Sequence, residues 1–149
     1  MVPPDQHTLL FIVGMHRSGT SALCAALHAC GASFGDNLLA PMAGVNDEGF
    51  WEDAEVVAIN DALLASVGGS WYAPGELAIA GNWPEAAVAL FAEQAAEILQ
   101  RGFGNGSLQV VKDPRFCLTL PLWLDLCAEH GMAARVCTTF RSPLEVAES

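Results

Sequence analysis

The sequence predicts an α/β fold, a three-layer domain in which helices cover both faces of a mainly parallel central sheet. Three short apolar runs, residues 9–13, 108–111 and 134–140, have the length and composition of buried parallel strands. Ala- and Leu-rich segments with helical spacing lie between them, as expected for parallel strands joined through helices. With 149 residues, 52% of them hydrophobic, the chain is long enough for one domain with its own core.

The first strand leads directly into a glycine-bounded loop and then into a helix. Gly14 and Gly19 bracket four residues, and a helix follows over residues 20–30, which Gly31 ends. In this strand–loop–helix arrangement, backbone N–H groups converge on an anion and the helix N-terminus adds partial positive charge. We therefore expect a P-loop-like domain that binds a phosphate-like group at this loop.

One position distinguishes this loop from the loop that binds nucleoside triphosphates. That motif, G-x-x-x-x-G-K-[ST], places a lysine against the β- and γ-phosphates, with magnesium beside it. Thr20 stands at the lysine position here, and the loop carries its cation earlier, at Arg17. The loop is therefore expected to bind a group with less charge to neutralise. A tight turn without a ligand is the structural alternative.

The region between the first helix and the second strand is expected to contain two loops and two helices. Residues 34–51 are rich in Gly, Asn and Asp and form a loop that can reach the sheet edge. Residues 54–66 are apolar at helical spacing, and 67–83 form an irregular surface segment. Residues 85–101 form an amphipathic helix, for which Pro84 is a suitable first residue.

The remaining elements alternate strand and helix. The run 108–111 is the second parallel strand, and residues 118–130 form a helix that Pro121 interrupts early. Residues 134–140 form the third strand, and Pro143 lies at the start of another helix.

Charge and cysteine content argue against several classes of function. A formal net charge of −11 argues against nucleic-acid binding through a general basic surface and against binding to an anionic membrane. Five cysteines without a C-x-x-C pair predict reduced thiols and a cytoplasmic protein, and the four histidines lack zinc-ligand spacing. The apolar run 9–13 is too short to span a membrane.

Four of the six cationic residues follow the ends of predicted strands. Arg17 lies in the first loop, Lys112 and Arg115 follow the second apolar run, and Arg141 follows the third. Because the carboxyl ends of parallel strands share one crevice, we expect these four side chains to converge there. A positive pocket in an otherwise acidic protein indicates an anionic ligand.

Three motifs follow the three predicted strands: residues 14–21 (GMHRSGTS), 112–115 (KDPR) and 140–149 (FRSPLEVAES). Together they resemble the motifs of the sulfotransferases that use 3′-phosphoadenosine 5′-phosphosulfate (PAPS). The first resembles that family's loop for the 5′-phosphosulfate and the third resembles its 3′-phosphate motif. The second resembles the middle motif, especially in the tyrosylprotein and bacterial branches. The chain therefore resembles the amino-terminal part of a bacterial-type sulfotransferase.

The resemblance implies a sulfotransferase and assigns roles to residues of this chain. The residues implied for the 5′-phosphosulfate are Gly14, His16, Arg17, Ser18, Gly19, Thr20 and Ser21. Arg141 and Ser149 would hold the 3′-phosphate, while Lys112 would act in catalysis with Arg17, on the sulfuryl group or its bridging oxygen. A sulfuryl group carries less negative charge than a phosphoryl group, so fixed cations can replace a metal ion. PAPS is therefore expected as the co-substrate, with no metal required.

The acceptor hydroxyl or amine needs a general base. The cytosolic branch of the family uses a histidine after the middle-motif lysine, where this chain has Asp113; other branches use a glutamate after the first helix. Glu52 is our choice, because its aromatic neighbours would desolvate it and raise its pKa. Glu48 and Asp113 are the alternatives. The candidates for an acceptor pocket, or else for the core, are Trp51, Trp71 and Trp83.

The third motif ends at Ser149, so we expect residues 1–149 to be a single sulfotransferase-like domain truncated at its carboxyl-terminal end, and inactive alone. Two other functions stay open. One is a P-loop kinase or nucleoside triphosphatase, which would bind ATP with magnesium; the other is a non-catalytic nucleotide-binding module. The sequence does not specify the oligomeric state, or whether the acceptor is a carbohydrate, a peptide or a small molecule.

Overall fold

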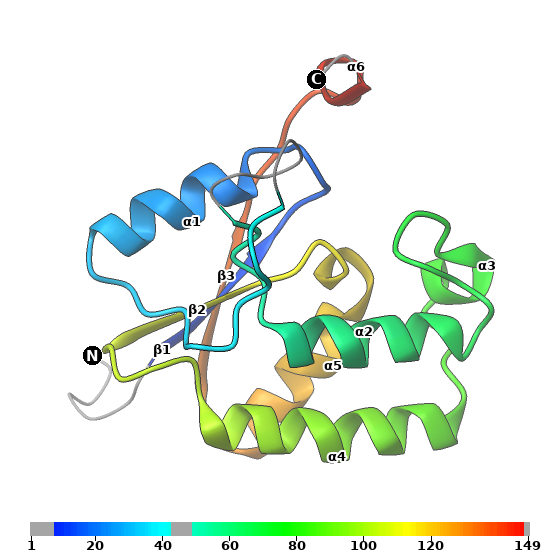
Figure 1. The fold of residues 1–149 in the computed structure, drawn as a ribbon. Helices are drawn as coiled ribbons and strands as arrows, with labels where there is room; N and C mark the ends of the chain where they lie inside the picture. Colours follow the sequence, from blue (N-terminus) through cyan, green and yellow to red (C-terminus); the bar gives the residue numbers. More distant parts are fainter. Residues whose placement is uncertain (1–7, 43–48, 148–149) are drawn as a thin grey trace.

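A three-stranded, all-parallel sheet forms the centre of the molecule, which confirms the predicted α/β class (Figure 1). The computed structural model describes residues 8–42 and 49–147. The strands are β1 (Thr8–Val13), β2 (Leu108–Lys112) and β3 (Ala133–Thr138), in the order β2-β1-β3. Thr8 pairs with Leu108 on one side and with Ala133 on the other, so the three strands start level.

Helices pack on both faces of this sheet (Figure 1). The described helices are α1 (Thr20–Ala29), α2 (Ala54–Ala65), α3 (Gly75–Ile79), α4 (Glu85–Arg101), α5 (Phe116–Glu129) and α6 (Pro143–Ala147). Of these, α1, α2, α4 and α5 contribute to the cores on the two faces. α1 lies on one face, and α5 lies on the other with α4 and α2 next to it. The helices α1 to α4 connect β1 to β2, and α5 connects β2 to β3.

The alternation of side chains along β1 produces two separate cores. Leu9, Phe11 and Val13 face the larger core, which they share with α2, α4 and α5. Ile12 faces the opposite way and packs with Cys24 of α1 in the smaller core. Successive side chains of a strand point to opposite faces, so a strand buried on both faces must be apolar throughout, as this one is.

Most element boundaries agree with the sequence prediction to within two residues, and α4 agrees at both ends. The segment 67–83 differs, because it contains the short helix α3. α5 begins at Phe116, two residues before the predicted start. The chain turns into this helix directly after β2, because the Asp113 carboxylate accepts a hydrogen bond from the backbone N–H of Arg115 at 2.8 Å.

Two expectations about proline are wrong. Pro121 lies inside α5 without interrupting it. The side chains of Phe116 and Trp123, each at most 1% exposed, pack against β1 and hold the helix on the sheet on both sides of the proline. Pro84 has a ψ of 135°, so it precedes α4 as its cap and the first helical residue is Glu85.

The loops that bear on function gather at the carboxyl-terminal edge of the sheet. Because all strands run the same way, the residues that follow β1, β2 and β3 all lie at this edge. Within residues 8–42 and 49–147, no helix combines the length and the apolar character that crossing a membrane requires.

Candidate functional site

A cavity of about 380 Å³ opens at the carboxyl-terminal edge of the sheet. It lies among the β1–α1 loop, the first turn of α1, the segment before α2, the end of β2 and the residues after β3. Its lining residues are His16, Arg17, Gly19, Thr20, Ser21, Ala22, Phe50, Glu52, Lys112 and Arg141. The structure thus brings together most of the site residues expected from the sequence.

The β1–α1 loop is fixed against the end of β3, and this requires a glycine at position 14. A Cβ built on Gly14 would lie 2.2 Å from Thr139 Oγ1 and 2.7 Å from Ser18 Oγ. Ser18 Oγ donates a hydrogen bond to the Met15 carbonyl at 2.6 Å and shares another of 2.8 Å with Thr139 Oγ1. Gly14 and Ser18 therefore shape the loop, and the loop residues His16, Arg17 and Gly19 line the cavity.

The first turn of α1 contributes the positive end of a helix dipole to the cavity. Gly19, with a φ of 91°, caps this helix, and no described side chain hydrogen-bonds to the cap. Thr20, Ser21 and Ala22 all line the cavity, and the first turn carries no acidic residue. Such a turn leaves its backbone N–H groups available to an anion.

Three cations from three strand ends also line the cavity: Arg17, Lys112 and Arg141. Arg17 has a φ of 63°, an uncommon conformation for a residue other than glycine. Arg141 donates a hydrogen bond from Nη1 to the Arg17 carbonyl at 3.3 Å, and its Nε lies 3.7 Å from Glu145 on α6. This contact joins the first and third motifs at one side of the cavity.

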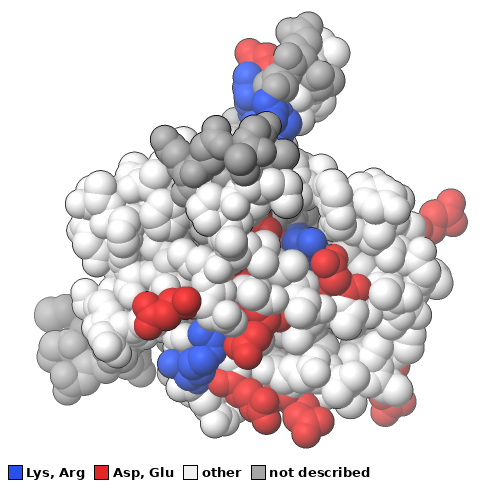
Figure 2. Space-filling view, viewed as in Figure 1, with Lys and Arg blue, Asp and Glu red and all other residues white. Residues whose placement is uncertain are grey.

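Acidic side chains on the face of the molecule drawn in Figure 2 gather mainly over α2 and α4, away from the strand ends. A further cavity of about 420 Å³, between α2 and α4, is lined by Glu55, Glu97 and Arg101 among others, and it lies away from the strand ends. The cavity at the strand ends therefore has the better electrostatic character for an anion.

Glu52 is held in the cavity wall by its own backbone and by the start of α2. Its carbonyl accepts a hydrogen bond from the Leu39 N–H at 2.8 Å. The next residue, Asp53, caps α2, because its carboxylate accepts hydrogen bonds from the N–H groups of Glu55 and Val56. The helix start fixes the chain direction, and Glu52 points toward β2.

Glu52 and Lys112 form a buried ion pair inside this wall. Lys112 Nζ donates to Glu52 Oε1 at 2.5 Å and to the Phe50 carbonyl at 3.0 Å. The two side chains are 7% and 5% exposed. Burial raises the pKa of the Glu52 carboxyl, and the charge and hydrogen bond of Lys112 act in the opposite direction. A carboxylate poised in this way can accept a proton.

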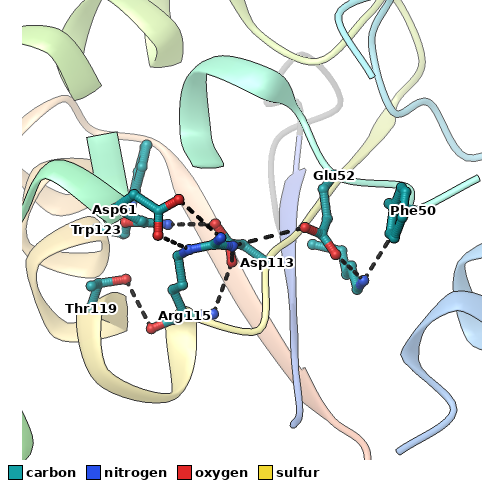
Figure 3. Close-up of polar contacts among 9 residues, drawn as sticks. Phe50, Glu52, Asp61, Asp113, Arg115, Thr119 and Trp123 are labelled. Atoms are coloured by element: carbon teal, nitrogen blue, oxygen red, sulfur yellow. Dashed lines mark hydrogen bonds and ion pairs between the residues drawn. The ribbon is translucent and has the colours of Figure 1, made fainter. Parts of the chain in front are cut away.

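Arg115, the fourth strand-end cation, does not line the cavity. It is buried and turned toward α2, where Nε and Nη2 donate to the two oxygens of Asp61 at 2.6 and 3.1 Å (Figure 3). Its Nη1 donates to Asp113 Oδ1 at 2.9 Å. Burial disfavours its charged form, but the carboxylates of Asp113 and Asp61 raise the pKa of Arg115 overall. The expected convergence of four cations is therefore wrong for this one.

Asp113, an alternative for the general base, is fully buried and occupied by structural hydrogen bonds. Oδ1 accepts from the backbone and side chain of Arg115, and Oδ2 accepts from Asn60 Nδ2 at 2.9 Å. Asn60 in turn accepts a hydrogen bond of 3.1 Å from Trp123 Nε1. These contacts tie the end of β2 to α2 and α5, and they turn Asp113 away from the cavity, whose lining includes Glu52.

His16 lies between the cavity and the surface segment that precedes α3. Its ring centroid is 4.8 Å from that of Trp71, which is half exposed. Burial, with Lys112 and Arg115 nearby, lowers the pKa of His16, so the ring is neutral at pH 7. His16 therefore packs against the segment before α3 and also lines the cavity.

The three tryptophans proposed for an acceptor pocket lie in different places, and among the described residues that line the cavity none is a tryptophan. Trp51 packs with His28 and Phe34 on the α1 side, and Trp83 packs on the larger core. Phe50 lines the cavity instead. The remaining expected site residues, Glu48 and Ser149, lie outside the described residues.

Sequence reasoning missed the residues that support the site from outside the motifs: Asn60, Asp61, Phe50 and Thr139. Asn60 and Leu64 lie four residues apart on α2, and both are fully buried. The available signal was an Asn on the buried face of an otherwise apolar helix, because a buried amide side chain needs hydrogen-bond partners. The other three residues have no local pattern that distinguishes them.

Comparison with known proteins finds no match among protein-family models, curated proteins or solved structures.

Proposed function

We propose that this protein is a sulfotransferase that moves a sulfuryl group from PAPS to a hydroxyl or amine acceptor. The observation that carries the proposal is the buried Glu52–Lys112 pair in the wall of a cationic cavity at a helix N-terminus. A carboxylate beside an anion site is unfavourable for binding alone, but proton transfer from an acceptor needs a general base, and a carboxylate can serve as one.

The hydrogen-bond donors and cations that line the cavity suit the anionic groups of PAPS. The first turn of α1 and the side chains of Arg17 and Lys112 suit a phosphosulfate, and Arg141 suits a second phosphate. PAPS would supply an activated sulfuryl group, bonded through oxygen to its 5′-phosphate.

Glu52 and Lys112 would divide the chemistry between them. Glu52 would take the proton of the acceptor hydroxyl or amine as the new bond to sulfur forms. Lys112 would stabilise the electron pair that the phosphate oxygen retains when its bond to sulfur breaks. Among the described residues its ammonium has two hydrogen-bond partners, so one of its three N–H donors is left for such an oxygen.

Fixed cations are sufficient for this reaction, because the sulfuryl group carries less charge than a phosphoryl group. A kinase or nucleoside triphosphatase needs more charge neutralised, with a lysine at the Thr20 position. The test is calorimetric titration of the full-length protein with 3′,5′-adenosine bisphosphate and, separately, with ATP and magnesium. We expect the bisphosphate to bind more tightly, and preference for magnesium-ATP would overturn the proposal.

A turnover assay separates an enzyme from a binding module. We expect the full-length protein to transfer labelled sulfate from PAPS to an acceptor within a panel of sugars, peptides and phenols. The matched variant is Glu52→Gln, which should lose transfer and still bind the bisphosphate. Bisphosphate binding without transfer to any class of acceptor would favour the module.

A further inference from the structure

The carboxylate of Glu52 lies between two cations, one near each oxygen. Lys112 Nζ is 2.5 Å from Oε1, and Arg115 Nη1 is 3.9 Å from Oε2 (Figure 3). The two cations come from the same strand end but face different surroundings. Lys112 lines the cavity, whereas Arg115 is buried behind Glu52.

The position of Arg115 is fixed by contacts that do not involve the cavity. Its planar guanidinium donates to both oxygens of Asp61 and to Asp113, so three of its nitrogens are engaged. Asp113 is itself held by Asn60, and Asn60 by Trp123. A guanidinium gripped in this way cannot turn toward a ligand in the cavity.

Lys112 differs in this respect, because its ammonium stands on a flexible stem and must serve two partners. An anion in the cavity competes with Glu52 for the charge of Lys112. Without another cation, Glu52 would then be a buried carboxylate beside an anion, and it would protonate. A protonated Glu52 cannot accept a proton from an acceptor.

We propose that Arg115 is the permanent counter-cation of Glu52, a positioning residue that keeps this carboxylate ionised and in place when Lys112 engages the bound anion. The inference rests on the proposed function for the role of Glu52 as the base. Asp61, which is partly exposed on α2, would act as the anchor that aims Arg115.

The other titratable groups near Glu52 among the described residues do not supply this charge. Cys24 on α1 is neutral, because burial raises its pKa to about 12. His16, in the same cavity wall, is neutral at pH 7. Asp113 opposes ionisation of Glu52 by its own charge. The charges of Lys112 and Arg115, the two described cations in ion-pair range of its carboxylate, favour the ionised form of Glu52.

The direct test is a carbon-13 NMR titration of the Glu52 carboxyl in the full-length protein without nucleotide. We expect Arg115→Gln to raise the titration midpoint of Glu52 above that of the wild-type protein, because a cation near 4 Å is lost. Arg115→Lys, which keeps the charge, should raise it less. The control is Glu55→Gln, another α2 carboxylate, whose partner is Arg101; it should leave the midpoint unchanged. A folded Arg115→Gln protein with the wild-type midpoint would overturn the inference.

Arg115→Gln leaves the carboxylates of Asp61 and Asp113 without their cation, which can prevent folding. A second variant is therefore needed. The double variant Arg115→Gln/Asp61→Asn removes one charge of each sign, and the same rise is expected, because Arg115 is the one that contacts Glu52.

Kinetics add a readout that a merely structural role would not change. In Arg115→Gln, the acidic limb of the kcat profile against pH should move to higher pH. A uniform fall in kcat at every pH would count against the inference. Failure of the protein to bind 3′,5′-adenosine bisphosphate would overturn the proposed function, while the NMR titration would still decide the role of Arg115.

Discussion

Lys112 Nζ lies 2.5 Å from Glu52 Oε1, and both side chains line a cavity to which Arg17 and Arg141 also belong. A buried ion pair of this kind costs desolvation energy that its attraction repays only in part. Its place in a ligand-sized cavity is why we propose a chemical role for the pair.

Glu52→Gln should abolish most of the transfer activity and keep nucleotide binding. The amide cannot accept a proton, so we expect kcat to fall by about 10²–10⁴-fold. Affinity for 3′,5′-adenosine bisphosphate should stay within a few-fold of wild type or increase, because Lys112 is released to the ligand. Labelled-sulfate transfer and calorimetry measure the two quantities. Loss of both in a folded variant would mean that Glu52 only shapes the cavity.

Arg141→Ala should weaken binding of the bisphosphate. A charge-assisted hydrogen bond contributes about 1.5–3 kcal/mol, so we expect the Kd to rise by roughly tenfold to a hundredfold. The matched control is Arg135→Ala on β3, an exposed arginine whose hydrogen bond is to the neighbouring Ala134 carbonyl. Equal effects of the two substitutions would point to net charge rather than to a phosphate contact.

Gly14→Ala should disturb the loop through a steric clash. Its Cβ would lie 2.2 Å from Thr139 Oγ1, so we expect destabilisation of about 1–3 kcal/mol and weaker bisphosphate binding. Urea unfolding and calorimetry would measure both. Adding Thr139→Ala removes the nearest atom and should restore part of the stability. No recovery in the double variant would show that the clash with β3 is not the cause.

Titration of Glu52 should make the unfolding free energy of the protein depend on pH. Burial raises the pKa of this carboxyl above its unfolded value of 4.5. The native state therefore binds the proton more tightly, and this contribution is present below pH 4.5 and is lost as pH rises through the native pKa. As pH rises from 4.5 through the native pKa, the unfolding free energy of Glu52→Gln should therefore rise relative to that of the wild-type protein. The expected change is about 1.4 kcal/mol for each pH unit between the unfolded and native pKa values of Glu52. Urea titrations at a series of pH values would measure the difference; a constant difference would contradict the prediction.

Trp123→Phe should destabilise the buried hydrogen bonds through Asn60 that support the site. The substitution removes the N–H that donates to Asn60 Oδ1 and leaves this buried oxygen without its partner, at a cost of about 1–3 kcal/mol. Trp71→Phe, at a half-exposed position, is the control and should change the unfolding free energy little. Similar losses in the two variants would argue that ring size, rather than the hydrogen bond, matters at position 123.

The sequence was sufficient for those features that depend on local pattern or on the geometry of parallel strands. The ends of α4 follow from its amphipathic spacing and from Gly102, both local signals. The convergence of Arg17, Lys112 and Arg141 follows from their positions after three strands of one parallel sheet. The choice of Glu52 came from a family resemblance, and the structure places this residue against Lys112.

The direction in which a side chain points after a strand was beyond the sequence. Lys112 and Arg115 are three residues apart, yet one faces the cavity and the other faces α2. The difference depends on Asp61, which is 54 residues earlier in the chain and has no pattern that marks it as a partner. α3 was missed for a similar reason, because one short helical turn within a Gly-rich segment leaves too few residues for a periodic signal.

The hydrogen bond between Ser18 and Thr139 has a consequence for ligand selection. It fastens the β1–α1 loop to the end of β3, and Arg141 follows Thr139 by only two residues. Arg141 also holds the carbonyl of Arg17. In the proposed function, the groups that would hold the 5′-phosphosulfate and the 3′-phosphate are therefore kept at a fixed spacing. A ligand whose two anionic groups match this spacing could bind both sets of groups, and a ligand with a different separation would bind only one of them.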